Sequence, residues 1–88
     1  MKLNEQFTIT KLGDEFVAVP LTNEEDFHGI VKLNESGAEI FRGLMEGEEV
    51  EQLIKRLMSK YPELDAETAK EATAGVIDSL RSGGILKI

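Results

Sequence analysis

The chain has 88 residues, the size of one domain with a modest core. Its 17 acidic and 10 basic side chains give a formal net charge of −7, and it has no cysteine. A surface of that sign repels phosphate backbones and anionic membranes, so it favours a protein or peptide partner or serves solubility alone. Without cysteine there are no disulfides and no thiolate metal sites. We therefore expect residues 1–88 to form a single domain that binds no cofactor, metal or nucleic acid.

The chain also gives no sign of export or of membrane insertion. Residues 1–5 contain no hydrophobic run, and no stretch is apolar for long enough to span a bilayer. We expect a cytoplasmic protein that does not associate with a membrane.

Alternating apolar and polar residues predict two strands, at about residues 5–12 and 15–20. Gly13 and Asp14 between them have the chemistry of a tight turn, so the two strands are expected to form a hairpin. Pro20 ends the second strand, because proline has no N–H to give to a sheet.

A third strand is predicted at about residues 28–33, after a polar, acidic connector at residues 22–26. Val31 and Leu33 alternate with Lys32, the period-two pattern of a half-buried strand. We expect Val31 and Leu33 to face the core, and His28, Ile30 and Lys32 to share the opposite face.

Three helices follow the strands. The first is expected between Asn34, a preferred N-cap residue, and Gly47, which lies where a glycine commonly follows a helix. The second begins near Val50 and must end before Pro62, with charges arranged as the helix dipole favours. The three apolar stripes that support these helices are Ala38, Ile40, Phe41, Leu44 and Met45; Val50, Leu53, Ile54, Leu57, Met58 and Tyr61; and Ala69, Ala72, Thr73, Val76, Ile77 and Leu80.

The third helix is expected to start after Asp65 and to end before the pair Gly83-Gly84. Its first half is rich in alanine, which either lets another backbone approach closely or reflects tight packing on a neighbouring helix. Residues 85–88, apolar except for Lys87, are expected to add a short strand or an apolar tail. The order of elements predicts an α+β, winged helix-turn-helix-like fold, in which an N-terminal three-stranded antiparallel sheet is followed by three helices.

The sequence offers little catalytic chemistry. His28 is the one histidine, and it has no cysteine and no metal-ligand spacing beside it. The glycines match neither a dinucleotide-binding nor a Walker-type phosphate loop. We therefore expect a protein that is not an enzyme.

Several residues carry a family resemblance that covers roughly residues 7–86. They are Leu33-Asn34, Ala38, Ile40-Phe41, Leu44, Gly47, Leu53, Leu57, Leu80 and Gly84-Ile85-Leu86. This pattern resembles the PqqD family, named for a small protein of pyrroloquinoline quinone (PQQ) biosynthesis. Related domains act as recognition elements in pathways that modify ribosomally made peptides (RiPP recognition elements).

The resemblance implies a peptide chaperone without catalytic activity. In similar domains the leader segment of a precursor peptide adds as a strand to the edge of the third strand, in a groove beside the third helix. The precursor is then presented to a modifying enzyme, which in the PqqD case is a radical S-adenosylmethionine enzyme (radical SAM enzyme). An exposed strand edge can pair with an extended peptide in this way, and it can also pair with a second copy of the chain to give a homodimer.

We predict seven peptide-binding residues on this basis. They are His28, Ile30, Val31 and Lys32 on the third strand, with Ala69, Thr73 and Ile77 on the third helix. The sequence does not say which alternate N–H groups of the third strand point away from the sheet.

Two other functions are compatible with the predicted fold. A winged-helix DNA-binding protein would carry lysine and arginine on its third helix. Here the acidic residues of that segment, Asp65, Glu67, Glu71 and Asp78, outnumber Lys70 and Arg81. Charge therefore disfavours DNA binding, whereas a purely structural interaction subunit remains an alternative.

Overall fold

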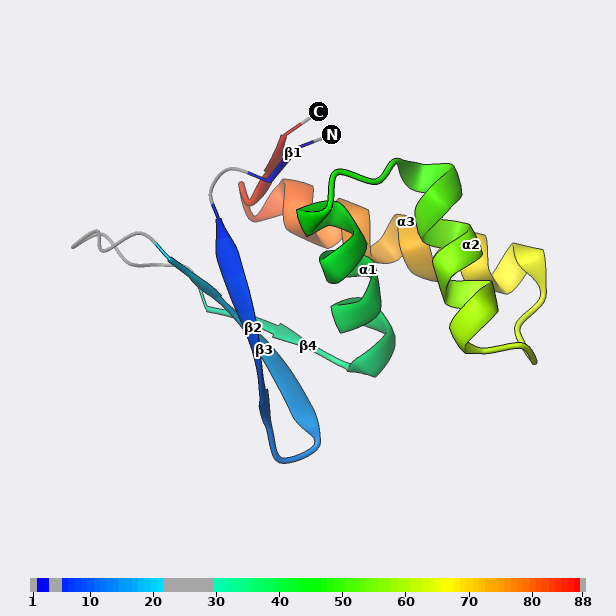
Figure 1. The fold of residues 1–88 in the computed structure, drawn as a ribbon. Coiled ribbons are helices and arrows are strands. Elements are labelled where there is room, and N and C mark those ends of the chain that lie inside the picture. The colour runs from blue at the N-terminus through cyan, green and yellow to red at the C-terminus, as the bar shows by residue number, and fades with distance from the viewer. Residues whose placement is uncertain (1, 4–5, 22–29, 88) are drawn as a thin grey trace.

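The computed structural model describes residues 2–3, 6–21 and 30–87. The elements in chain order are β1 (Lys2–Leu3), β2 (Phe7–Leu12), β3 (Glu15–Pro20), β4 (Val31–Leu33), α1 (Glu35–Met45), α2 (Val50–Lys60), α3 (Ala66–Ser82) and β5 (Leu86–Lys87). Strands β2, β3 and β4 form an antiparallel sheet in that order, and β1 pairs with β5 (Figure 1). The predicted α+β fold, with a three-stranded antiparallel sheet followed by three helices, is confirmed.

The pairing of β3 with both neighbours sets the two faces of the sheet. Ala18 lies opposite Val31, and Ala18 is fully buried. Val31 and Leu33 pack against the core, whereas Lys32 is exposed, as the alternation predicts. The observed β4 is shorter than the predicted strand and begins at Val31; residues 28–29 lie outside the described residues.

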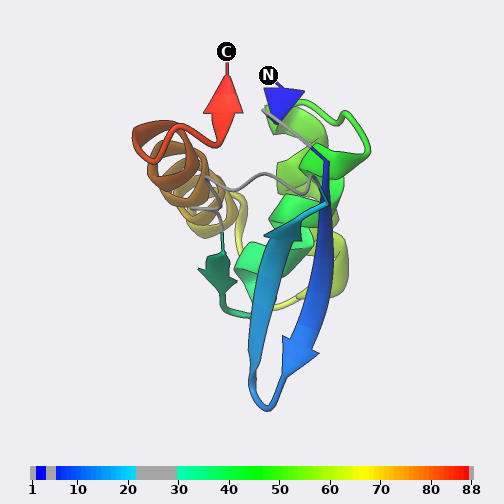
Figure 2. The same ribbon diagram turned by 90° about the vertical axis from the view of Figure 1, so that its left-hand side faces the viewer.

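Helix α1 lies at the centre of the structure. It contacts β1, all three strands of the sheet, and both α2 and α3. Ile40 and Phe41 are fully buried, and the ring of Phe41 meets the ring of Phe7 edge to face, with 5.2 Å between their centroids. Figure 2 shows the β2–β3 hairpin in front of α1 and α3 to one side. Helix α1 is thus the element on which the sheet and the other helices pack.

The helix ends follow the predicted capping. The side-chain oxygen of Asn34 accepts a hydrogen bond from Gly37 N at 2.7 Å, and that of Asp65 accepts one from Thr68 N at 2.8 Å. Gly47 and Gly84 follow α1 and α3 with φ angles of +84° and +75°. After each glycine, the N–H of the next residue donates a hydrogen bond to a carbonyl of the last helical turn. This arrangement is a Schellman motif, which requires a residue with a left-handed backbone conformation.

Helices α1 and α2 approach closely at Gly43. A Cβ atom added there would clash with the side chain of Leu53 and would lie 2.7 Å from Glu48 Oε1. Over this contact Arg56 forms ion pairs with Glu39 at 2.8 Å and with Glu48 at 3.0 Å. Burial alone would raise the pKa of Glu39, but the hydrogen bond from Arg56 and the charge of a nearby lysine lower it overall. The missing side chain of Gly43 therefore lets the two helices meet beneath an ion-pair network.

Strands β1 and β5 bring the two ends of the described chain together. Leu3 lies opposite Leu86, and Leu86 is buried in the core. A strand at the C-terminus was one of the two predicted possibilities, whereas β1 was not predicted.

We expect Leu57→Ala to lower the free energy of unfolding by about 2–5 kcal/mol, because Leu57 is fully buried and its truncation leaves a cavity. Leu12→Ala is the matched control, since Leu12 is 60% exposed, and it should cost less than about 1 kcal/mol. Urea denaturation monitored by circular dichroism measures both. Equal losses for the two variants would contradict the observed core.

Candidate functional site

Strand β4 presents an open edge. It is the last strand of its sheet, and within residues 2–3, 6–21 and 30–87 no strand pairs with its outer side. Helix α3 faces this edge (Figure 2), yet no Cα atom of β4 lies within 8 Å of a Cα atom of α3, and both elements are fully described. Neighbouring strands in a sheet lie about 4.8 Å apart. The backbones of β4 and α3 therefore do not pack directly on each other, and a strand added to β4 would lie on the side that α3 faces.

Between β4 and α3 lies a groove of about 450 Å³, which we call the edge groove. One wall is formed by residues 31–34, Ser36 and Gly37, and the other by Glu71, Ala72, Gly75, Val76, Ser79 and Leu80. Ligand pockets commonly have volumes of about 300–1,000 Å³. The edge groove thus has the size and the concave form of a binding site.

Several residues along the α3 wall of the edge groove have small side chains or none. Ala72, Gly75 and Ser79 lie along it, and a Cβ atom added at Gly75 would have no other atom within 4 Å. Apolar contacts come from Val31, Leu33 and Val76, and the charged side chains are Lys32 and Glu71. The groove can therefore receive a peptide backbone closely while still contacting its side chains.

Two of the four predicted strand residues line this groove. Val31 and Lys32 line it, and Ile30, just before β4, is 54% exposed. His28 lies outside the described residues.

The predicted helix residues are buried and do not line the edge groove. Ala69 and Thr73 are fully buried and Ile77 is 7% exposed. Thr73 Oγ1 donates a hydrogen bond to the carbonyl of Ala69 at 2.8 Å, which satisfies its hydroxyl inside the core. These residues form the inner face of α3, and the groove is lined instead by Ala72 and Val76, each one position earlier than Thr73 and Ile77.

A second hollow, the Tyr61 pocket, continues the edge groove. Its volume is about 360 Å³, and its lining comprises Asn34, Glu35, Ser36, Leu57, Tyr61, Glu63, Leu64, Thr68 and Ala72. The Tyr61 hydroxyl is enclosed beside Glu35. Burial raises the pKa of the Tyr61 phenol above its ordinary value, and the negative charge of Glu35 raises it further. Sequence reasoning treated Tyr61 only as part of the apolar stripe of the second helix.

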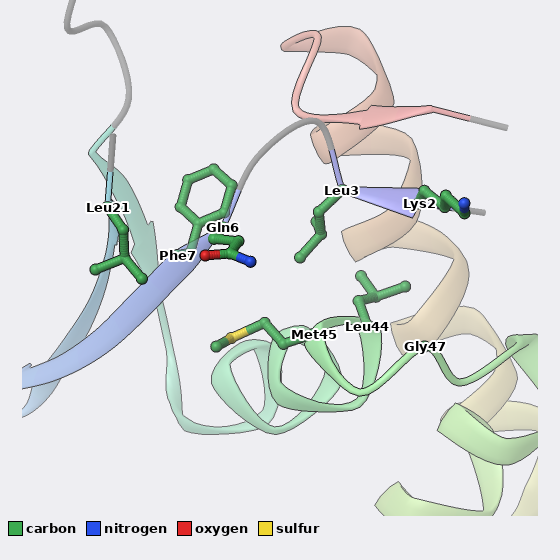
Figure 3. Close-up of a pocket in the computed structure, with 8 residues that line it drawn as sticks. All are labelled: Lys2, Leu3, Gln6, Phe7, Leu21, Leu44, Met45 and Gly47. Atoms are coloured by element: carbon green, nitrogen blue, oxygen red, sulfur yellow. The ribbon is translucent and has the colours of Figure 1, made fainter. Parts of the chain in front are cut away.

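A third hollow lies near the start of the chain, and we call it the N-terminal cavity. It has a volume of about 520 Å³ and is lined by Lys2, Leu3, Gln6, Phe7, Leu21, Leu44, Met45 and Gly47 (Figure 3). Leu3 and Leu44 point toward each other in it, and Leu21 is 58% exposed. The sequence did not predict this cavity, because the two residues of β1 are too few to show a periodic pattern.

Two further findings on the described residues concern metal binding and membrane insertion. Within it, no group of three or more histidine, cysteine, aspartate or glutamate side chains is placed to hold a metal ion. None of its helices combines the length and the apolar character needed to cross a membrane.

Comparison with known proteins gives one family and two similar structures. The sequence model of the family described as coenzyme PQQ synthesis protein D (PqqD) matches residues 15–86. A structure of TbiB1 in complex with the TbiA(beta) leader peptide has a TM-score of 0.75 and 21% sequence identity, covering 99% of this chain and 95% of that chain. A structure of lasso peptide synthetase B1 complexed with the leader peptide has a TM-score of 0.70 and 20% identity, covering 96% and 93%. At these identities the likeness shows a shared fold, and no curated protein sequence matches significantly.

We expect opposite effects from replacing two helical glycines by alanine. Gly75→Ala should stabilise the protein by about 0.5–1 kcal/mol, because alanine favours the helix and the added methyl group meets no atom. Gly43→Ala should destabilise it, because Leu53, Glu48 and Arg56 would have to move. Thermal and urea unfolding of both variants tests this, and a stabilised Gly43→Ala would contradict the α1–α2 contact described above.

Proposed function

The chain belongs to the PqqD family, and we propose that it captures the leader segment of a ribosomally made precursor peptide and presents that precursor to a modifying enzyme. The observation that carries the proposal is the open edge of β4, which faces α3 across the edge groove. The two similar structures, each of which holds a leader peptide, support it.

Strand addition supplies the binding mechanism. An extended peptide placed along β4 pairs its N–H and C=O groups with those of the open edge, which gives affinity that depends little on sequence. Specificity then comes from alternate side chains of the peptide, which contact Val31 and Lys32 on one wall and Ala72 and Val76 on the other. Ile30, which is exposed just before β4, and His28 stay part of the proposed site.

The proposed role is one of binding and positioning, without a covalent step. The resemblance to PqqD implies a radical SAM enzyme as the partner, the family name refers to PQQ synthesis, and one similar structure is named lasso peptide synthetase B1. Both names are consistent with a domain that holds a precursor while another protein modifies it. A homodimer formed through β4 would occupy the same edge, so self-association and peptide binding should compete.

The charge of α3 argues against DNA as the ligand. Beside the edge groove this helix carries Glu71, and one of its two basic residues, Arg81, lies 3.9 Å from Asp78. A winged-helix protein that reads DNA needs basic side chains on this helix to neutralise phosphates.

We expect Gly75→Trp to abolish peptide binding while leaving the fold intact. The indole would fill the edge groove, and the space around Gly75 is open, so the helix need not move. Ala74→Trp is the matched control, because Ala74 is exposed on the same helix and lines none of the three hollows. The probe is an array of overlapping segments from the short reading frames that flank the gene.

Wild type and Ala74→Trp should bind one segment with a dissociation constant of roughly micromolar or below, and Gly75→Trp at least about a hundredfold more weakly. Circular dichroism of each variant verifies folding. If the folded Gly75→Trp binds as tightly as wild type, the edge groove is not the binding site. If wild type binds no segment of any flanking frame, the proposed function fails.

Single proline substitutions at Ile30, Val31 and Lys32 test strand addition itself. Proline removes one N–H, and along an edge strand alternate N–H groups point toward the neighbouring strand or toward the open side. We expect one parity to keep the fold and lose binding of the selected segment, and the other to damage the fold. Titration calorimetry and thermal unfolding of every variant separate the two effects. Normal binding by all folded variants would rule out pairing along β4.

A further inference from the structure

We propose that the bound peptide carries a lysine or arginine next to its strand-forming segment, and that this cationic side chain binds in the Tyr61 pocket. The inference rests on the proposed function and specifies the class of peptide that the domain selects.

The Tyr61 pocket lies where a bound peptide would leave the edge groove. Asn34, Ser36 and Ala72 line both hollows, so the two are continuous. Because Asn34 directly follows β4, the pocket lies beyond the Leu33 end of the strand. A peptide paired antiparallel to β4 would therefore place there a residue on the N-terminal side of its paired segment.

The charge of the Tyr61 pocket is negative and uncompensated. Glu35 on α1 and Glu63 in the connector before α3 both line it, and no lysine or arginine does. Neither carboxylate forms an ion pair within the part of the chain that the structure describes. By contrast, Glu39 and Glu48 are paired with Arg56. The acidic side chains of the pocket are thus available to a cation from outside.

The Tyr61 hydroxyl lies enclosed in this pocket. Besides burial, the charge of Glu35, a side-chain hydrogen bond with Glu35 and the charges of Glu39 and Glu63 raise the pKa of the Tyr61 phenol, so a negative field is felt at this oxygen. An ammonium or guanidinium group would donate to the hydroxyl oxygen and neutralise that field.

The rest of the lining suits the stem of a long basic side chain. Leu57, Leu64 and Ala72 provide apolar surface, against which lysine and arginine pack their methylene groups. The two acidic groups lie toward the exposed rim, since Glu35 and Glu63 are both exposed. A cation can therefore bury its stem and keep its head beside the carboxylates.

The competing ligand is an anion held by helix N-termini, because α1 and α3 both begin at this pocket. One first-turn N–H of each helix already has a partner, since Gly37 N donates to Asn34 and Thr68 N donates to Asp65. The positive end of a helix dipole corresponds to about half an elementary charge, and Glu35 and Glu63 each carry a full negative charge. Electrostatics therefore favours a cation.

The test uses a displayed library of random linear dodecapeptides, panned in parallel on four proteins. These are wild type, the folded groove-blocked Gly75→Trp, the pocket variant Glu35→Gln/Glu63→Gln, and the control variant Glu15→Gln/Glu51→Gln. Glu15 and Glu51 are exposed and line none of the three hollows, so the control removes the same net charge elsewhere. Sequencing identifies the peptides that wild type retains and Gly75→Trp loses.

Among these groove-dependent peptides we expect lysine or arginine at one fixed position. Peptides selected by the control variant should show the same preference, and peptides selected by the pocket variant should not. In a synthetic peptide from this set, replacing that basic residue by leucine should weaken binding to wild type at least about tenfold, and should change binding to the pocket variant little. Three results would overturn the inference and leave the proposed function standing. The groove-dependent peptides could show no preference for a basic residue, or they could prefer an acidic residue at that position. The peptides selected by the pocket variant could also keep the same basic preference as those selected by wild type. Recovery of no groove-dependent peptide would overturn both.

Discussion

The packing of α1 on its neighbours is the contact on which the rest of the structure depends. Ile40 and Phe41 are fully buried between the sheet and the other two helices, and Asn34 joins β4 directly to the start of α1. The position of β4 is therefore fixed by the helix that follows it rather than by the sheet alone. Because α3 packs on α1 and α2 without approaching β4, a gap remains between α3 and the sheet edge. The edge groove is a consequence of how the core is built.

An open strand edge normally promotes association between copies of a protein. In this molecule β4 spans only three residues, and Lys32 at its centre is exposed, features that limit indiscriminate pairing. The net charge of −7 further separates the copies. The edge thus stays available to an extended chain that also fits the helical wall, where Gly75 leaves open space at some expense in helix stability.

The sequence predicted the fold well because its signals are local. Asn34 and Asp65 as caps, Gly47 and Gly84 as helix ends, and the hairpin turn at Gly13 all follow from single-residue chemistry. The groove was predicted less well because α3 has small residues on two adjoining faces. Consecutive residues of a helix are rotated by about 100° about its axis, so Ala72 and Thr73 both fit one broad apolar stripe. Which of the two is buried depends on where α2 packs, and the sequence of α3 alone does not show this. The Tyr61 pocket and the N-terminal cavity each join residues distant in the chain, and no local pattern marks such contacts.

The pairing of β1 with β5 has a consequence for larger assemblies. Lys2 lies opposite Lys87, so a tether attached at either end of the domain departs from the same point on its surface. A partner fused before the domain and one fused after it are then attached at neighbouring points of the domain. By the same reasoning a circularly permuted chain, joined across β1 and β5 and opened at the Gly13-Asp14 turn, retains every helix and every strand.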